Sequence, residues 1–126
     1  MTSDGHPPLA RRNVTDTAAT DAIVLIYAVI PDEQDADHIA GALLLRGLIA
    51  RAQYWSVTEL EMWGGEPQSS ESTAMILTTR ASLAERAITE ARTIVPKGTP
   101  TFVVLDAIGG LPVFRDVVLG VTKDRT

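Results

Sequence analysis

The stretch Ala-Ile-Val-Leu-Ile-Tyr-Ala-Val-Ile, residues 22–30, is apolar throughout and is followed directly by Pro31. A run this short, rich in β-branched residues and stopped by a proline, predicts a β-strand. Strands without alternating polar positions are typical of sheets that are covered on both sides. We therefore expect this strand to be buried on both faces and to lie near the centre of a sheet.

A helix is predicted directly after this strand. Asp32 can act as its N-cap, and Glu33 and Asp35 fall in the first turn, where the helix dipole favours acidic side chains. Gly47 suits the position just beyond the C-terminal end. Between these limits, apolar residues recur at the spacing of one buried helical stripe: Ala36, Ile39, Ala40, Leu43 and Leu44.

The next segments predict a β-hairpin. Residues 52–63 form a long predicted strand, residues 64–67 a turn, and residues 73–79 a third strand that pairs back. Further along, residues 102–105 predict a fourth strand, and a short helix is expected at about residues 112–119.

A second helix is predicted between the third and fourth strands. Ser82 and Glu85 have the spacing of a capping box, and Pro96 and Gly98 would end the helix. Its buried stripe would consist of Leu83, Ala87, Ile88, Ala91 and Ile94.

The order of these elements is β-α-β-β-α-β followed by a short helix. This order predicts a ferredoxin-like α+β fold, in which two helices cover one face of a four-stranded antiparallel sheet and the first and third strands are central. We expect a mobile tail over residues 1–20, one domain over residues 21–120 and a C-terminal tail over residues 121–126.

The composition excludes several classes of function. The chain of 126 residues has a net charge of −5 and no cysteine. Cysteine-based zinc sites, disulfides and thiolate catalysis are therefore excluded. The sequence has no basic run, so we expect no nucleic acid and no anionic membrane as a partner. With no long apolar stretch to act as a signal or a membrane span, a cytoplasmic location is expected.

Five stretches resemble, in order, motifs of the CutA (divalent-cation tolerance) family. They are residues 30–43, 47–53, 58–66, 75–80 and 95–100. The resemblance, to a divergent member of the family, covers residues 22 to about 119. The residues that match the family's framework positions are Trp63, Gly65, Thr79, Pro96 and Pro100.

The same alignment shows that most of the family's reactive side chains are replaced. The family's cysteine position holds Arg51, and its neighbouring asparagine position holds Gln53. The histidine and tyrosine of a His-Pro-Tyr motif fall on Val95 and Lys97. The resemblance thus implies a framework whose metal ligands are largely missing.

The resemblance also implies a homotrimer, because long second and third strands of the family form sheets between subunits. The predicted strand over residues 52–63 is longer than a typical strand of five or six residues. Its free edge would invite aggregation unless it is paired inside a closed assembly. A strand that simply bends is the alternative. We interpret Trp63 as a packing residue of the interface.

Metal binding is the first candidate chemistry. His38 lies near Asp35 at the start of the first predicted helix, and this pair could hold copper or zinc weakly. The alternative is a solvated helix face, because one imidazole and flexible acids do not form a closed site. The other histidine, His6, lies in the predicted tail. No other cofactor is expected.

A small-anion site is the second candidate. Arg51, Arg80 and Lys97 could converge in clefts between subunits and hold a carboxylate or phosphate, as in PII-type signal proteins, whose trimer the family resembles. Solvated surface cations are the alternative. No nucleophile elbow or phosphate-binding glycine loop is present, so we expect no enzymatic activity. A non-enzymatic trimeric CutA-like protein is the leading hypothesis, and a small-ligand sensor is the alternative.

Overall fold

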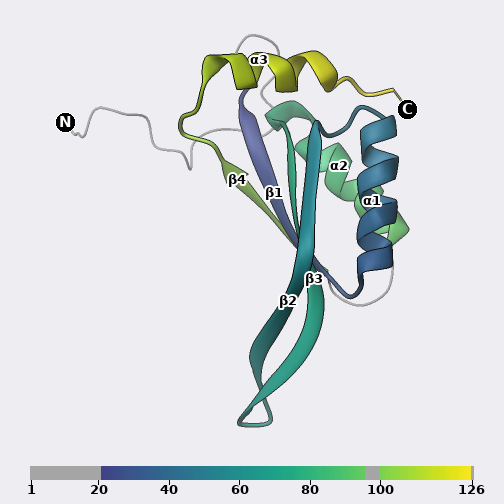
Figure 1. Cartoon of the computed structure of the whole chain (residues 1–126), viewed down its shortest axis with the longest axis vertical. Coiled ribbons are helices and arrows are strands. Elements are labelled where there is room, and N and C mark those ends of the chain that lie inside the picture. The colour runs from purple at the N-terminus through teal and green to yellow at the C-terminus, as the bar shows by residue number, and fades with distance from the viewer. Residues whose placement is uncertain (1–20, 96–99, 126) are drawn as a thin grey trace, which may run out of the picture.

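The computed structural model describes residues 21–95 and 100–125. The predicted ferredoxin-like α+β fold is confirmed (Figure 1). In chain order the elements are β1 (Ile23–Ile30), α1 (Glu33–Leu45), β2 (Arg51–Trp63), β3 (Glu66–Arg80), α2 (Ala81–Ile94), β4 (Thr101–Asp106) and α3 (Pro112–Val121). The predicted mobile tail, His6, Pro96 and Lys97 lie outside the described residues.

The sheet has the order β2-β3-β1-β4, and all three pairings are antiparallel. The prediction that the first and third strands are central is confirmed. Figure 1 shows α1 and α2 on one face of the sheet, while α3 runs across the end at which β1 begins. None of the helices in the described part of the chain is long and apolar enough to cross a membrane.

Burial along β1 alternates from one residue to the next. Val24, Ile26 and Ala28 are 0% exposed and pack in the core under α1 and α2. The residues between them face the other side of the sheet and are only partly buried. The expectation of burial on both faces is therefore wrong for the single chain, because the two helices cover one face only. We call the uncovered side the open face.

Helix α1 begins and packs largely as expected. The Asp32 side chain accepts a hydrogen bond from the backbone N–H of Asp35 at 2.9 Å, which caps the first turn. Leu44 departs from the predicted stripe because it lies beside the buried face and is 41% exposed. The buried residues of the helix are Ala36, Ile39, Ala40 and Leu43.

Helix α2 begins differently from the prediction. It starts at Ala81, and no side chain of its N-cap residue, Arg80, makes a capping hydrogen bond. The predicted capping box of Ser82 and Glu85 is wrong, since Ser82 is already inside the helix and bonds to Asp21 instead. The fully buried residues of α2 are all alanines, Ala81, Ala84, Ala87 and Ala91.

The hairpin of β2 and β3 is longer than predicted. Pairing continues from Arg51↔Thr78 to Trp63↔Glu66, so the third strand begins well before residue 73. Gly64 and Gly65 make the turn with φ values of 59° and 85°, a backbone conformation that glycine adopts without strain. Residues 57–72, which we call the arm, project beyond the helices (Figure 1).

The C-terminal residues lie against the domain, although we expected a tail from residue 121. Thr122 is 1% exposed, and the backbone N–H of Arg125 donates to the carbonyl of Arg46 at 2.7 Å. The guanidinium of Arg86 forms an ion pair with Asp124 at 3.0 Å. This segment therefore closes over the turn between α1 and β2.

Candidate functional site

The predicted metal-binding residues, His38 and Asp35, both lie on α1. His38 is exposed and Asp35 is half-buried. Within residues 21–95 and 100–125, no group of three or more histidine, cysteine, aspartate or glutamate side chains is arranged to hold a metal ion. The described part of the chain thus offers no closed coordination shell around His38.

Tyr54 of β2 contacts the acidic N-terminal part of α1. The Tyr54 hydroxyl donates a hydrogen bond to the carboxylate of Asp37. This bond raises the pKa of the Tyr54 phenol above its ordinary value, and desolvation and the charges of Asp37 and Glu33 act in the same direction. The contact ties the start of α1 to the edge strand.

The two described arginines of the predicted anion site both contact α3. By the strand register, Arg51 and Arg80 lie on the open face. The guanidinium carbon of Arg51 is 5.2 Å from the centre of the Phe114 ring, a cation–π contact. Arg80 donates through Nε to the Thr122 hydroxyl at 3.0 Å and through Nη2 to the carbonyl of Leu119. Both side chains therefore hold α3 in place across the sheet end.

The framework residues in the described part of the chain do not lie together in one site. Trp63 is 70% exposed at the tip of the arm, and Gly65 forms the turn beside it. Thr79 is fully buried, and its hydroxyl donates to the carbonyl of Leu48 at 2.7 Å. This bond joins β3 to the segment between α1 and β2. Pro100 is half-buried directly before β4.

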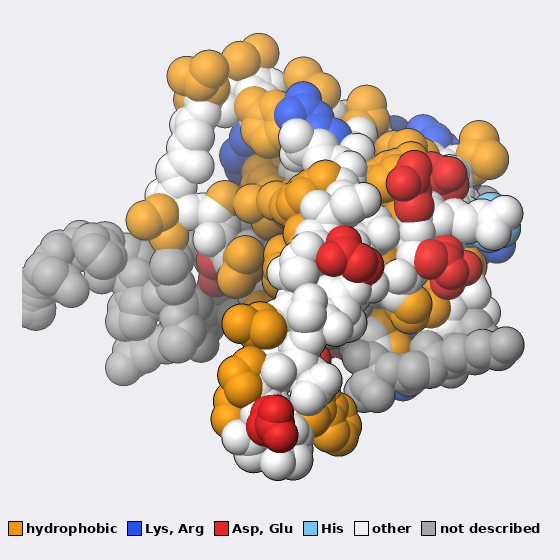
Figure 2. Space-filling model, turned by 60° about the horizontal axis from the view of Figure 1, so that its bottom comes forward, with side chains coloured by type: hydrophobic (Ala, Val, Ile, Leu, Met, Phe, Trp, Pro, Cys, Tyr) orange, Lys and Arg blue, Asp and Glu red, His pale blue; other side chains and the backbone are white. Residues whose placement is uncertain are grey.

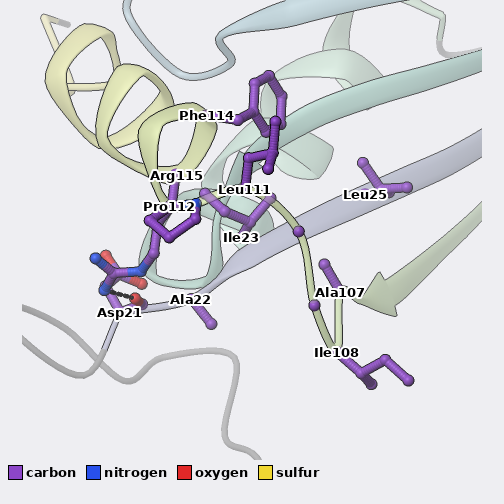
Figure 3. A pocket seen from close by; sticks show the side chains of 12 residues that line it. Asp21, Ala22, Ile23, Leu25, Ala107, Ile108, Leu111, Pro112, Phe114 and Arg115 are labelled. Atoms are coloured by element: carbon purple, nitrogen blue, oxygen red, sulfur yellow. Dashed lines mark hydrogen bonds between the residues drawn. The ribbon is translucent and has the colours of Figure 1, made fainter.

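A cavity of about 700 Å³ lies where β1 begins, and the sequence analysis did not identify it (Figure 3). Its walls come from β1, from residues 107–111 and from the first turns of α3. The signal in the sequence was the pair Gly109-Gly110 between apolar neighbours, which by itself indicates only a turn. The apolar wall residues include Ile23, Leu25, Ile108, Leu111 and Phe114.

The polar end of this cavity is formed by Asp21 and Arg115. Arg115 donates from Nη2 to the backbone carbonyl of Asp21 at 2.7 Å, a bond drawn in Figure 3. The Asp21 carboxylate accepts from the N–H and hydroxyl of Ser82 at 3.0 and 2.5 Å and lies 3.5 Å from Arg80. The acid is thus satisfied by α2 and β3.

A second, smaller hollow of about 260 Å³ lies at the base of the arm and is acidic. Of the glutamates that line it, Glu59 and Glu71 accept hydrogen bonds from hydroxyls of the paired strand. Ser72 donates to Glu59 at 2.8 Å, and Thr58 donates to Glu71 at 2.7 Å. These bonds hold the two strands of the arm together. We therefore interpret Glu59 and Glu71 as structural residues of the arm and not as metal ligands.

The arm and the open face expose apolar side chains. Figure 2 shows hydrophobic side chains on both sides of the arm tip, with acidic groups between them. The exposed fractions at the tip are 69% for Leu60, 66% for Met62 and 70% for Trp63. On the open face, Val103 and Leu105 are 44% and 47% exposed.

These features define a small α+β sandwich with one uncovered sheet face and a projecting β-hairpin. The sequence profile of the CutA1 divalent ion tolerance protein family matches residues 24–119. The chain belongs to this family.

Solved structures agree with this assignment. The divalent ion tolerance protein CutA1 of Ehrlichia chaffeensis is 29% identical over 83% of this chain and 99% of its own, with a TM-score of 0.76. The periplasmic divalent cation tolerance protein CutA of Archaeoglobus fulgidus is 24% identical over 80% and 99%, with a TM-score of 0.74. CutA1 of Oryza sativa, 19% identical over 80% and 94%, has a TM-score of 0.73. No curated protein sequence matches the chain significantly.

Proposed function

We propose that the protein is a non-enzymatic homotrimer that acts in divalent-cation tolerance. The observation that carries the proposal is the arm, whose tip exposes Leu60, Met62 and Trp63 in the single chain. Leu60 and Met62 lie on one side of the two-stranded arm and Trp63 on the other, so both sides of the tip offer exposed apolar side chains of the kind found at protein–protein interfaces. The number of subunits and the link to cation tolerance rest on the family resemblance.

A closed ring of subunits accounts for both exposed surfaces together. Each buried Å² of apolar surface contributes roughly 25 cal/mol, so covering the arm tip and the open face would favour association. A ring also pairs or covers the long free edge of β2, which otherwise is a template for aggregation. The arm is long enough to lie against a neighbouring subunit rather than its own helices.

The first experiment is the solution mass, measured by light scattering behind a sizing column with and without copper. A stable trimer in both conditions supports the proposed assembly. A single-chain mass in both conditions contradicts it, and a trimer that forms only with copper makes metal a structural component.

Any metal binding by this chain is proposed to be weak, because Arg51 and Gln53 stand where the family has cysteine and asparagine. Copper and zinc prefer imidazole and thiolate ligands, which leaves His38, with Asp35 beside it. Titration of the protein with each ion, monitored by calorimetry, is expected to show low affinity that falls further in His38→Ala. Unchanged affinity in this variant would remove His38 from the proposal.

A PII-like role in sensing a small anion between subunits is the second candidate, favoured by the exposed position of Arg51 on the open face. Arg80 supports it less, because its Nε and Nη2 groups already donate to Thr122 and Leu119. The role predicts that nucleotides or carboxylates raise the melting temperature and that Arg51→Ala or Lys97→Ala abolishes the shift.

A cytoplasmic location is likewise proposed, although the Archaeoglobus fulgidus relative is described as periplasmic.

A further inference from the structure

We propose that the cavity at the start of β1 binds a small molecule with an apolar body and one carboxylate, which Arg115 anchors. Neither Arg51 nor Arg80 is among the described residues that line this cavity, so it differs from the anion site considered above. Ile23 and Leu25 of its lining belong to the open face, so the proposal requires that this end of the open face stays accessible in the assembly proposed above.

The size and walls of the cavity fit an apolar body. Its volume of about 700 Å³ falls within the roughly 300–1,000 Å³ that is usual for small-molecule pockets. Ile23 and Leu25 form one wall, and Ile108 and Leu111 stand at the loop side, where they are 77% and 71% exposed. A bound apolar body would remove this surface from water.

The polar end carries two charged groups, and the Asp21 carboxylate is already balanced by Arg80 at 3.5 Å. Within the described residues, the carboxylate ion pairs involve Arg46, Arg80 and Arg86, and none involves Arg115. The bond of Arg115 to the Asp21 carbonyl uses one of its five N–H groups. The remaining donors and the full positive charge are available to an anion.

Helix α3 adds to the positive potential at the same wall. Its N-cap residue, Leu111, makes no side-chain capping bond, and no acidic residue lies in its first turn. Both Leu111 and Pro112 line the cavity. The positive end of the helix dipole is therefore not compensated locally, which favours a negative group.

Together these groups select for an amphipathic anion. A neutral apolar molecule would leave the charge of Arg115 without a partner, and a small hydrophilic anion would leave the apolar walls in water. A carboxylate accepts two parallel hydrogen bonds from a guanidinium. A phosphate monoester shares this chemistry, so the test must distinguish the two head groups.

The test uses calorimetric titration of the full-length protein with octanoate, 1-octanol, acetate and octyl phosphate. Octanoate is expected to bind, and octanol and acetate are expected to bind at least tenfold more weakly. If octyl phosphate binds more tightly than octanoate, the head group of the ligand is a phosphate monoester and not a carboxylate. No binding of octanoate at millimolar concentration, or equal binding of octanol, overturns it.

Variants connect the binding to the cavity. Arg115→Gln keeps a polar amide but lacks the charge, and it should weaken octanoate binding roughly 10- to 100-fold, the range of a charged hydrogen bond. Arg115→Lys should recover part of this loss, and Ala107→Leu, which adds bulk to the lining, should also weaken binding. Arg92→Gln, the same charge change at an exposed position of α2, should have no effect. An equal loss in Arg92→Gln, or none in Arg115→Gln, overturns the assignment.

Discussion

The carboxylate of Asp21 accepts hydrogen bonds from the backbone N–H and the hydroxyl of Ser82, 61 positions further along the chain, at 3.0 and 2.5 Å. Asp21 is 1% exposed, so the bonds are made away from water. Directly beside them, the N–H of Ala81 donates to the carbonyl of Ala22 at 2.7 Å. Asp21, two residues before β1, thus supplies the cap that α2 lacks and fixes the two elements to each other.

Replacing Asp21 with alanine is expected to reduce the free energy of unfolding by about 3 kcal/mol. The change removes two hydrogen bonds to a buried carboxylate and leaves Arg80 without its ion-pair partner. The matched control is Asp32→Ala, which removes the exposed cap of α1 and should cost only about 1 kcal/mol. Urea unfolding of both variants measures the difference. Equal losses would show that Asp21 acts as an ordinary cap.

The parts of the fold with local signals were predictable from the sequence. The apolar run of β1 and the helical stripe from Ala36 to Leu43 depend on residues close together in the chain. The cap of α2 had no such signal, because it is supplied by Asp21, which is distant in the chain. The capping-box pattern of Ser82 and Glu85 was present locally, but the tertiary contact of Ser82 with Asp21 prevailed.

The length of the hairpin was underestimated for a different reason. Residues 66–72 are polar and contain Pro67 and two glutamates, a composition that disfavours a strand. Pairing with β2 and hydrogen bonds such as that from Ser72 to Glu59 extend the strand regardless. Such cross-strand contacts cannot be predicted from the sequence of one segment alone.

The candidate site was less predictable than the fold. Arg51 and Arg80 were identified as surface cations of interest, yet their contacts with Phe114 and Thr122 depend on where α3 packs. The cavity with Arg115 likewise forms only when α3 crosses the end of β1. Neither arrangement has a sequence motif, because it joins segments that are far apart in the chain.

The arm tip should be essential for self-association. Trp63 is 70% exposed in the single chain, and Trp63→Glu places a charge where we propose that a neighbouring subunit packs. The expected result is a fall in solution mass toward the single chain, measured by light scattering. Leu45→Glu is the control, because Leu45 is 81% exposed at the end of α1 and its replacement should leave the mass unchanged. An intact assembly in Trp63→Glu would place the interface elsewhere.

Tyr54 should titrate above the ordinary tyrosine pKa of about 10. The hydrogen bond to Asp37 favours the neutral phenol in the folded state. Its contribution to stability is therefore complete below the unfolded pKa and is lost as the pH rises through the raised folded pKa. The difference in ultraviolet absorbance between the wild type and Tyr54→Phe follows this one group. Asp37→Asn should lower the pKa toward the ordinary value, and an unchanged pKa would mean that the bond has no effect in solution.

Gly47 should be intolerant of any side chain because of the C-terminal segment. A Cβ at this position would lie 1.9 Å from the backbone carbonyl oxygen of Lys123, and its φ is 73°. Gly47→Ala is expected to cost more than about 2 kcal/mol in urea unfolding, since backbone strain and a backbone clash add. Gly64→Ala has a similar φ of 59° with nothing within 4 Å, so it should cost only about 1 kcal/mol. In a protein that lacks residues 123–126, the cost of Gly47→Ala should fall to that of Gly64→Ala, because only the strain remains. An unchanged cost in the shortened protein would show that the C-terminal segment does not press against this turn in solution.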